Sequence, residues 1–572
     1  MSYRRILFPL VISLLATGCN RLGYQSIKRA SGLEGMIVSA HPLATAAGTE
    51  ILRAGGNATD AAIAVQFALA VVVPRAGNLG GGGFWVHAPA SDKVRTLDYR
   101  EEAPAAATRD MYLDESGDPV EGASTKGALA AGIPGTVDGM WTAYTFGSKL
   151  RDWSALLQPA IRLASSGFRV SAEEARRLNL YQDDFGRYAT RSPFYKAGTA
   201  NGDAAWKRGD LLQQPRLAAT LSAIADEGPG YFYEGDFARR LAEEVSTRGG
   251  IWTAADLSGY QSVWREPIEI DYAGLDIYSM PPPSSGGIVL AQMLGLLDGY
   301  DLNSIAQTDS AAYFHLLIEA MRRAYEDRAE YLGDPDLVDI PVDSLLSTPY
   351  LLSKWETFSP DTATRSGLSL KPGTKEVYET THTSVVDGEG NAVSVTTTLN
   401  GNYGSKVWSE VGGFFLNNEM DDFSMKPGVP NMFGLVGGDA NAIAPGKRML
   451  SSMTPVVAKR GEETVVVVGS PGGSTIITAV MQVLLNLEVH RLSPTRAVAK
   501  PRIHHQWLPD EVLYEPGAMS PAVRQALEAK GHTFRQVETL GRVKLVARPE
   551  VGEKTYIGVG DERSPDDSAA TP

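Results

Sequence analysis

Alternating apolar and polar positions define a hairpin in the last third of the chain. Residues 392–398 read Ala-Val-Ser-Val-Thr-Thr-Thr, a β-branched run in near period-2 alternation that predicts a strand. Residues 380–387, Thr-Thr-His-Thr-Ser-Val-Val-Asp, precede this run across a Gly390–Asn391 turn. Two such runs around a glycine-containing turn predict a β-hairpin.

Other segments are apolar along their whole length. Residues 464–469, Thr-Val-Val-Val-Val-Gly, predict a buried strand, and a helix is expected to begin near Ile476. Residues 58–73 are also strongly apolar, but the run is shorter than the ~20 residues that a bilayer crossing requires. Asn57 precedes it and is a residue type that caps helix N-termini. We therefore expect a buried core helix after Asn57.

The N-terminus has the pattern of an export signal. Arginines at positions 4 and 5 precede an apolar run, residues 6–15, that is too short to span a bilayer. Residues 15–19, Leu-Ala-Thr-Gly-Cys, resemble a bacterial lipobox, in which small residues precede a lipid-modified cysteine. We expect a signal peptide over residues 1–18, followed by a tether over residues 19–34 that begins with lipidated Cys19. The alternative is an ordinary signal peptide with an incidental cysteine.

Export sets the expected location of the protein. A lipidated Cys19 places the protein outside the cytoplasm, and Asn20 after it permits sorting to the outer membrane of a Gram-negative cell. We therefore expect a periplasmic protein whose membrane contact is only through the lipid anchor. Cys19 is also the single cysteine of the chain, which excludes internal disulfides and cysteine-based metal sites.

Composition limits the remaining function classes. The chain has 572 residues, of which 43% are hydrophobic, so it can bury a large core. Length alone suggests three or four domains. The net charge of −14 and the absence of any basic run argue against nucleic-acid binding. The polar tail, residues 561–572, is expected to fray.

The predicted hairpin begins with a candidate nucleophile. A threonine hydroxyl reacts poorly at neutral pH unless a base lies beside it, and the α-amino group of the same residue can be that base. Cleavage of the Glu379–Thr380 bond would create this amine, whose ordinary pKa of ~7.7–8.0 suits proton transfer. For a threonine-rich strand taken alone, the alternative is that it is only a strand.

Separated motifs occur along the chain in a fixed order. They are residues 78–84 (Asn-Leu-Gly-Gly-Gly-Gly-Phe), 99–104 (Tyr-Arg-Glu-Glu-Ala-Pro), 280–287 (Met-Pro-Pro-Pro-Ser-Ser-Gly-Gly), 398–400 (Thr-Leu-Asn), 416–424 (Leu-Asn-Asn-Glu-Met-Asp-Asp-Phe-Ser), 427–431 (Pro-Gly-Val-Pro-Asn), 450–455 (Leu-Ser-Ser-Met-Thr-Pro) and 469–474 (Gly-Ser-Pro-Gly-Gly-Ser). This order resembles that of the γ-glutamyltransferases, a family of self-processing N-terminal nucleophile hydrolases. The resemblance extends from about residue 35 to about residue 566 and is far more specific than a single glycine-rich loop.

The resemblance implies a fold and a maturation step. The implied fold is α+β: a four-layer αββα sandwich of the N-terminal nucleophile hydrolase type, forming one compact unit. Self-cleavage at Glu379–Thr380 would give a large subunit (residues 35–379) and a small subunit (residues 380–572), which remain together as a heterodimer. No cofactor and no metal ion are implied, and no histidine partners the acidic pair at positions 421 and 422 at metal-ligand spacing.

The resemblance also implies roles in acyl transfer. Thr380 is the nucleophile, its freed amine is the base, and the hydroxyl of Thr398 orients it. The N–H groups of Gly472 and Gly473 form the oxyanion hole, at a predicted strand-to-helix turn where glycines let the backbone approach a ligand closely. From the residues alone, Thr398 could equally be a plain strand threonine.

Further matches form a clamp for the charged end of a glutamate. Arg100 is the cation for the α-carboxylate, because a guanidinium binds carboxylates with two hydrogen bonds. Ser451 and Ser452 donate to the same carboxylate. The α-ammonium is assigned to three residues, Asn400, Glu419 and Asp422. Two carboxylates suit one buried ammonium, because a buried cation needs paired anions.

Residues 427–447 have the length and sequence of the lid loop that covers the site in many bacterial members of that family. This chain carries Phe433 where those members have a tyrosine. A phenylalanine can cover a bound γ-glutamyl group but cannot hydrogen-bond to Asn400. The balance between transpeptidation and hydrolysis is therefore left open. The lid itself favours a γ-glutamyltransferase over the related glutaryl (cephalosporin) acylases, which tend to lack one.

Together these features predict an exported γ-glutamyltransferase with glutathione hydrolase activity. The expected partners are small molecules: glutathione and other γ-glutamyl donors, with water, amino acids or dipeptides as acceptors. One alternative is an acylase of the same fold that takes glutaryl amides, which would leave Glu419 and Asp422 unpaired. The other alternative is a non-catalytic periplasmic binding lipoprotein.

Overall fold

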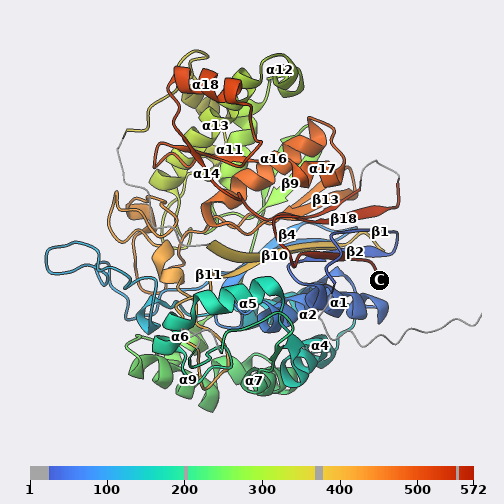
Figure 1. The fold of residues 1–572 in the computed structure, drawn as a ribbon, viewed down its shortest axis with the longest axis vertical. Coiled ribbons are helices and arrows are strands. Elements are labelled where there is room, and N and C mark those ends of the chain that lie inside the picture. The colour runs from blue at the N-terminus through green and yellow to red at the C-terminus, as the bar shows by residue number, and fades with distance from the viewer. Residues whose placement is uncertain (1–24, 199–203, 368–377, 549–552) are drawn as a thin grey trace, which may run out of the picture.

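Two stacked antiparallel sheets form the centre of the molecule (Figure 1). The structure, a computed structural model, describes residues 25–198, 204–367, 378–548 and 553–572. The first sheet has the strand order β1-β18-β17-β13-β12-β9-β8, and the second has the order β19-β2-β10-β11-β3-β4-β7. Strands from the two ends of the chain therefore meet in both sheets.

The strands are short and mostly buried. Those of the first sheet are β1 (Arg29–Gly32), β8 (Ile268–Tyr272), β9 (Leu275–Ser279), β12 (Val456–Arg460), β13 (Glu463–Gly469), β17 (Lys544–Ala547) and β18 (Tyr556–Gly560). Those of the second sheet are β2 (Gly35–Ser39), β3 (Gly82–Ala88), β4 (Arg95–Tyr99), β7 (Val263–Arg265), β10 (Tyr378–Asp387), β11 (Ala392–Gly401) and β19 (Ser568–Ala570). Smaller sheets pair β5 (Phe168–Arg169) with β6 (Leu211–Leu212), and β14 (Ile503–His504) with β15 (Val512–Tyr514) and β16 (Phe534–Gln536).

Helices cover the outer face of each sheet (Figure 1). The layer over the first sheet contains α11 (Gly286–Leu297), α12 (Leu302–Thr308), α13 (Ser310–Tyr331), α14 (Val342–Leu345), α15 (Thr348–Trp355), α16 (Ile476–Glu488), α17 (Pro494–Ala499) and α18 (Pro521–Lys530). The layer over the second sheet contains α1 (Pro42–Arg53), α2 (Ala58–Val72), α3 (Thr136–Gly147), α4 (Trp153–Ser166), α5 (Ala172–Leu180), α6 (Gln182–Tyr188), α7 (Pro215–Glu227), α8 (Gly230–Tyr233), α9 (Gly235–Thr247) and α10 (Ala254–Gly259). The predicted α+β, four-layer αββα sandwich is confirmed.

Three apolar layers hold the sandwich together. Between the sheets, side chains such as Met36, Phe84 and Val467 form one cluster. The two larger clusters lie between each sheet and its own helices. A strand such as β13 has apolar neighbours on both faces, which explains its unbroken valine run. Because every layer shares a sheet with the next, the chain forms one unit rather than the several domains that its length suggests.

The main sequence predictions for local structure are confirmed. The predicted hairpin is β10 and β11, and the predicted buried strand is β13. Helix α16 begins at Ile476, and α2 begins after Asn57. Asn57 accepts from the N–H of Asp60 while Asp60 accepts from the N–H of Asn57, so the cap satisfies two donors reciprocally.

Both ends of the described chain belong to the folded body, which corrects two expectations. Arg29–Gly32 was assigned to a tether, but it forms β1 and pairs with β18 at the edge of the first sheet. The C-terminal tail does not fray: Ser568–Ala570 forms β19 and pairs with β2, and Asp567 is fully buried. The side-chain pattern of these segments does not predict strands. They pair at sheet edges through backbone N–H and C=O groups, which do not depend on the side chain. The predicted signal peptide and Cys19 lie outside the described residues.

The internal apolar runs are core elements. Every residue of α2 is buried between the second sheet and neighbouring helices. None of the helices in the described part of the chain combines the length and apolar character that a bilayer crossing needs.

Candidate active site

Thr380 lies near the start of β10, directly opposite Thr398 on β11. Opposed residues of an antiparallel pair project from the same face, and the two hydroxyl oxygens are 3.5 Å apart. The Thr398 hydroxyl also accepts a hydrogen bond of 2.7 Å from the N–H of Asn400. Both threonines are buried. The structure thus brings the predicted orienting hydroxyl against the predicted nucleophile.

A bulge in the hairpin lies beside Thr380. Tyr378 is opposite Gly401 whereas Thr380 is opposite Thr398, so two steps along β10 face three steps along β11. The extra residue is on β11, where Asn400 adopts a φ of 72°. Asparagine tolerates this left-handed region better than most residues, and bulges commonly re-aim side chains next to active sites. Asn400 accordingly lines the cavity that Thr380 faces.

The predicted oxyanion glycines occupy a turn between β13 and α16. Gly472 precedes and Gly473 begins a 3-10 turn, η5 (Gly473–Thr475), with φ values of 144° and 57° that favour glycine. A Cβ at Gly473 would lie 2.5 Å from the ring of Phe433, and one at Gly472 would lie 2.6 Å from the Thr475 hydroxyl. The first N–H groups of a helical turn have no partner inside that turn, so they can donate to an oxyanion.

The charged residues of the predicted clamp are ion-paired with one another. Arg100 follows β4 and is fully buried. Its guanidinium contacts Glu419 at 2.7 Å, Asp422 at 2.5 Å and Glu101 at 3.4 Å. Glu419 and Asp422 are the ends of a single 3-10 turn, η3 (Glu419–Asp422). The sequence assigned Arg100 and the two acids to opposite charges of a ligand, and the structure joins them in one cluster because buried charges must be paired.

The crowded carboxyl groups of this cluster have raised pKa values. Burial is the main cause that raises the pKa of Glu419 well above its ordinary value, with Arg100 opposing it. Burial likewise raises the pKa of Asp422, and it raises that of Glu101 to about 7. Glu419 Oε1 has no hydrogen-bond partner within the described residues. A buried acceptor without a partner suits a donor that a ligand brings.

The sequence indicated no role for the motif at residues 280–287. In the structure, this motif holds the loop that carries Ser451 and Ser452. Ser284 pairs with Ser451 in an isolated bridge. Ser285 donates to the carbonyl of Ser451 from both its N–H and its hydroxyl, each at 2.7 Å. These contacts fix the loop that presents Ser451 and Ser452 to the cavity.

One charged lining residue was not predicted. Arg328, near the end of α13, is 5% exposed and lines the same cavity. Its guanidinium donates to the hydroxyl of Ser285 at 3.0 Å and to that of Ser452 at 3.2 Å. A lone arginine in a helix is usually solvated, and Arg322 and Arg323 on this helix are buried without lining the cavity. The sequence pattern therefore could not single Arg328 out.

The predicted lid segment closes over the cavity. Phe433 and Leu435 line it, and Phe433 is 8% exposed. The Phe433 carbonyl accepts a hydrogen bond of 3.2 Å from Gln506 Nε2. Gln506 Oε1 in turn accepts from the hydroxyl of Ser474 at 2.7 Å. Gln506, which the sequence did not indicate, therefore links the lid backbone to the residue after Gly473.

These groups converge on one small cavity, here named the Thr380 cavity. Of the predicted active-site residues, all of them described, only Gly472 does not line it. The lining comprises Arg100, Arg328, Thr380, Thr398, Asn400, Glu419, Asp422, Phe433, Leu435, Ser451, Ser452, Met453, Gly473, Ser474 and Ile476. Its volume of about 20 Å³ leaves room for roughly one water molecule. A larger ligand can enter only when the lid or the clamp moves.

Residues 44–571 match the sequence profile of the family described as gamma-glutamyltranspeptidase. The chain belongs to the gamma-glutamyltranspeptidase family. It is 44% identical over 543 residues to the glutathione hydrolase proenzyme of Escherichia coli K12, covering 94% of this chain and 92% of that protein. Because the alignment covers 94% of this chain, the similarity includes both sheets and both helical layers.

Solved structures of the family's fold are similar as well. The crystal structure of a cephalosporin acylase from Bacillus halodurans superposes with a TM-score of 0.81 at 27% identity, covering 96% of this chain and 98% of that chain. A gamma-glutamyltranspeptidase of Helicobacter pylori is 42% identical, with a TM-score of 0.56, covering 61% of this chain and 97% of that chain.

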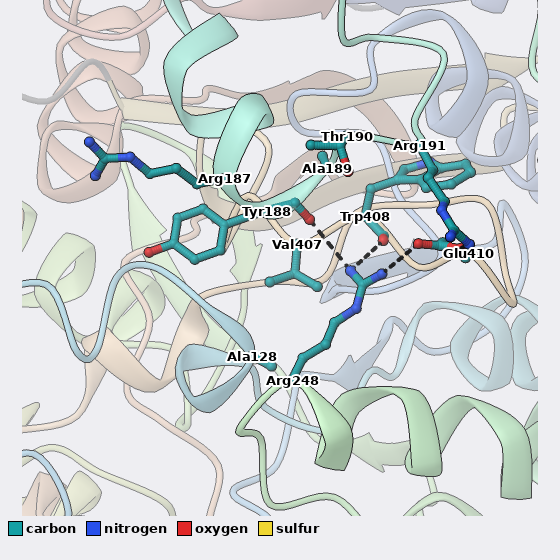
Figure 2. Close-up of a pocket in the computed structure, with 10 residues that line it drawn as sticks. All are labelled: Ala128, Arg187, Tyr188, Ala189, Thr190, Arg191, Arg248, Val407, Trp408 and Glu410. Carbon is teal, nitrogen blue, oxygen red and sulfur yellow. Dashed lines mark hydrogen bonds and ion pairs between the residues drawn. The ribbon is translucent and has the colours of Figure 1, made fainter.

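This gamma-glutamyltranspeptidase-family chain has a second, larger cavity (Figure 2). Its volume is about 260 Å³, and its lining includes none of the predicted site residues. Arg248 donates there to the carbonyls of Tyr188 and Trp408 and to Glu410, and Arg191 also pairs with Glu410. Two of its three arginines are thus already engaged in joining α6, α9 and the loop after β11.

One described cluster in the gamma-glutamyltranspeptidase-family fold has metal-ligand residue types. Potential ligand atoms of His315, Glu319 and His532 lie within 4.8 Å of one another. Glu319, however, pairs with Arg322 at 3.3 Å and Arg323 at 2.6 Å, and the two imidazoles hydrogen-bond to each other at 2.7 Å. Glu319, both nitrogens of His315 and one nitrogen of His532 are engaged. Two guanidinium groups also repel an added cation, so we interpret the cluster as structural.

Proposed function

We propose that the chain is a self-processing γ-glutamyltransferase that also hydrolyses glutathione. The observation that carries this proposal is the convergence on one cavity of Thr380, the Thr398 hydroxyl, Gly473 and the charged cluster around Arg100. Acyl transfer from a γ-glutamyl amide needs a nucleophile, oxyanion donors and sites for both charges of the glutamate. The family membership and the similarity to a glutathione hydrolase proenzyme support the same reaction.

Maturation precedes activity in this proposal. The Thr380 hydroxyl oxygen attacks the carbonyl carbon of Glu379, the peptide C–N bond breaks, and the acyl group moves to the oxygen as an ester. The nitrogen gains a proton and becomes the free amine, and water then hydrolyses the ester. The large subunit ends at Glu379 and the small subunit is residues 380–572. The bulge beside Thr380 supports this step, because irregular pairing restrains the neighbouring peptide less than a regular ladder.

The mature amine then serves as the base for transfer. It accepts the Thr380 hydroxyl proton as the oxygen attacks the γ-carbonyl of the donor, and it returns a proton to the leaving amine. The N–H groups of Gly472 and Gly473 would stabilise the oxyanion, a contribution worth about 3–4 kcal/mol per donor. Water or an amine then attacks the ester on Thr380, which yields glutamate or a new γ-glutamyl compound.

The clamp would open its internal ion pairs when the donor binds. The α-ammonium meets Glu419 and Asp422, and the α-carboxylate meets Arg100 with the hydroxyls of Ser451 and Ser452. Glu419 Oε1, buried without a hydrogen-bond partner within the described residues, is the acceptor most ready for an ammonium donor. The zwitterion then supplies a cation to the acidic pair and an anion to Arg100.

Two rival functions are weaker. A glutaryl amide has no α-ammonium, so a glutaryl acylase would leave Glu419 and Asp422 without a cation from the substrate; the cephalosporin acylase named above is also less similar in sequence than the glutathione hydrolase. A non-catalytic binding lipoprotein would not need the Thr380 and Thr398 hydroxyls to lie in the same cavity as the charged cluster. We therefore keep the transferase as the proposal.

Export, lipidation of Cys19 and periplasmic location complete the proposal. They rest on the pattern of residues 1–19 alone, which lies outside the described residues.

The test combines processing with a donor panel. Purified protein is expected to give two fragments, with the smaller one beginning at Thr380 by N-terminal sequencing. It should release p-nitroaniline from the γ-glutamyl anilide and glutamate from glutathione. A single uncleaved chain that is inactive on both donors would contradict the proposal. So would p-nitroaniline release from the glutaryl anilide that is as fast as release from the γ-glutamyl anilide.

A further inference from the structure

The Thr380 cavity contains two buried arginines with different surroundings. Arg100 is engaged by Glu419, Asp422 and Glu101. Arg328 has two hydroxyl partners, and no carboxylate forms an ion pair with it within the part of the chain that the structure describes. Burying a guanidinium without a paired anion costs desolvation free energy. A buried arginine of this kind is therefore expected to bind an anionic ligand or to have a specific structural role.

The hydrogen bonds of Arg328 determine how Ser452 can act. Arg328 Nη2 donates to the Ser452 oxygen at 3.2 Å, which occupies one lone pair of that hydroxyl. The Ser452 proton is thereby left free to donate into the cavity that it lines. Arg328 Nε donates to the Ser285 oxygen, and the Ser285 hydroxyl donates to the carbonyl of Ser451. One guanidinium therefore fixes both ends of the serine pair.

The charges around the cavity also favour an anion near Arg328. Glu419, Asp422 and Glu101 already engage Arg100, so part of its positive charge is compensated before a ligand arrives. Arg328 supplies the second positive charge among the lining residues. A zwitterion brings one charge of each sign, and two arginines with two acids match it.

We propose that Arg328 is the positioning and specificity residue for the α-carboxylate of the donor. It turns the Ser452 hydroxyl toward that carboxylate and adds positive charge to that of Arg100, which carboxyl groups of the protein already engage. This inference rests on the proposed function, because it names the residue that selects the donor at the same site.

The experiment compares two donors with the same leaving group. One is γ-glutamyl-p-nitroanilide, and the other is its analogue with an α-carboxamide in place of the α-carboxylate. In Arg328→Gln, KM for the carboxylate donor should rise about tenfold or more, the usual effect of losing a charge-assisted hydrogen bond. KM for the carboxamide donor should hardly change, so the preference of the wild type for the carboxylate should largely disappear. Arg328→Lys keeps the positive charge but loses the planar set of N–H donors of the guanidinium. It should therefore restore part of the preference for the carboxylate donor.

Arg323→Gln is the matched control. Arg323 is buried on the same helix and paired with Glu319, but it does not line the cavity. Its loss should lower the melting temperature and leave the donor preference intact. Each variant is first checked for two fragments on a gel. If Arg328→Gln is not cleaved into two fragments, Arg328→Lys is measured instead. Its preference for the carboxylate donor over the carboxamide donor should then be smaller than that of the wild type.

Two results would overturn the inference. One is an equal loss of kcat/KM for both donors in the Arg328 variants, which marks a purely structural role. The other is an unchanged preference. A wild-type enzyme that cleaves neither donor is a different failure, because it removes the proposed function itself.

Discussion

The ring of Phe433 packs against the backbone of Gly473, so closely that a Cβ on Gly473 would lie 2.5 Å from the ring. The lid and the predicted oxyanion turn are therefore in direct contact, and only glycine permits this contact. Gln506 ties the same two segments together by bonding to the Phe433 carbonyl and the Ser474 hydroxyl. The lid is thus latched through its backbone, which a phenylalanine can provide as well as a tyrosine.

Gln506→Glu should loosen this latch with little change of shape. The variant keeps an acceptor for Ser474 but loses the donor to the Phe433 carbonyl, a bond worth about 1 kcal/mol. We expect the acyl-enzyme to admit water more often. The ratio of free glutamate to γ-glutamyl-dipeptide, measured with glycylglycine as acceptor, should rise by a few-fold. A ratio equal to that of the wild type would show that the lid is held by packing alone.

Phe433→Tyr tests the side chain of the lid separately. A tyrosine hydroxyl could add a hydrogen bond to Asn400, which lines the same cavity. We expect the product ratio to shift toward the dipeptide, by about 1 kcal/mol at most. A shift toward glutamate would mean that the tyrosine disturbs the contact with Gly473.

Thr380→Ala should remain a single chain without activity, because no hydroxyl remains to attack the Glu379 carbonyl. Thr398→Val, which removes only the neighbouring hydroxyl 3.5 Å away, should process and react more slowly rather than not at all. Gel electrophoresis over time and N-terminal sequencing measure both effects. Normal cleavage of the Thr380→Ala chain would show that the nucleophile is misassigned.

The raised pKa of Glu419 predicts a pH-dependent donor affinity. Below this pKa the carboxyl group is neutral, so the proton must leave before a donor ammonium can pair with it. KM for the γ-glutamyl anilide should therefore increase as the pH falls below the raised pKa of Glu419. Glu419→Gln cannot titrate and should show a flatter profile over the same range. Parallel profiles for the two enzymes would contradict the assignment of Glu419 to the ammonium.

The buried pair of His315 and His532 predicts loss of stability in acid. His315 Nε2 faces the Ser359 carbonyl, which can only accept, so His315 Nδ1 must accept from His532 Nε2 at 2.7 Å. Protonation of both imidazoles would set two N–H groups against each other. Burial is the main cause that lowers the pKa of His315, and it lowers that of His532 to about 3.

Stability falls in acid because the unfolded chain binds more protons than the folded chain. Because the folded pKa values lie below the ordinary value of 6.5, the unfolded chain binds protons that the folded chain does not. The contribution is complete above pH ~6.5 and is lost as the pH falls toward the folded values. The melting temperature should therefore drop between pH 7 and pH 5, and less steeply in His532→Gln, which keeps a donor near the same place. Equal slopes for the two proteins would show that other groups control acid stability.

The sequence by itself determined the elements whose pattern is local. The hairpin of β10 and β11, the valine strand β13 and the capped helix α2 all have side-chain periodicity or a cap within a few residues. The motif order also indicated the family, and most residues of the Thr380 cavity were named from it. Cleavage at Glu379 and lipidation of Cys19 stay predictions.

Tertiary structure decided what depends on distant partners. Arg328 lines the cavity, and Gln506 holds the lid over it, only because α13 and the segment after β14 fold against this region, and neither residue has a distinguishing local pattern. β1 and β19 are polar segments that become strands because an open sheet edge accepts their backbone groups. The pairing of Arg100 with Glu419 and Asp422 is likewise a tertiary result, because residues more than 300 positions apart are buried together and their charges must then compensate.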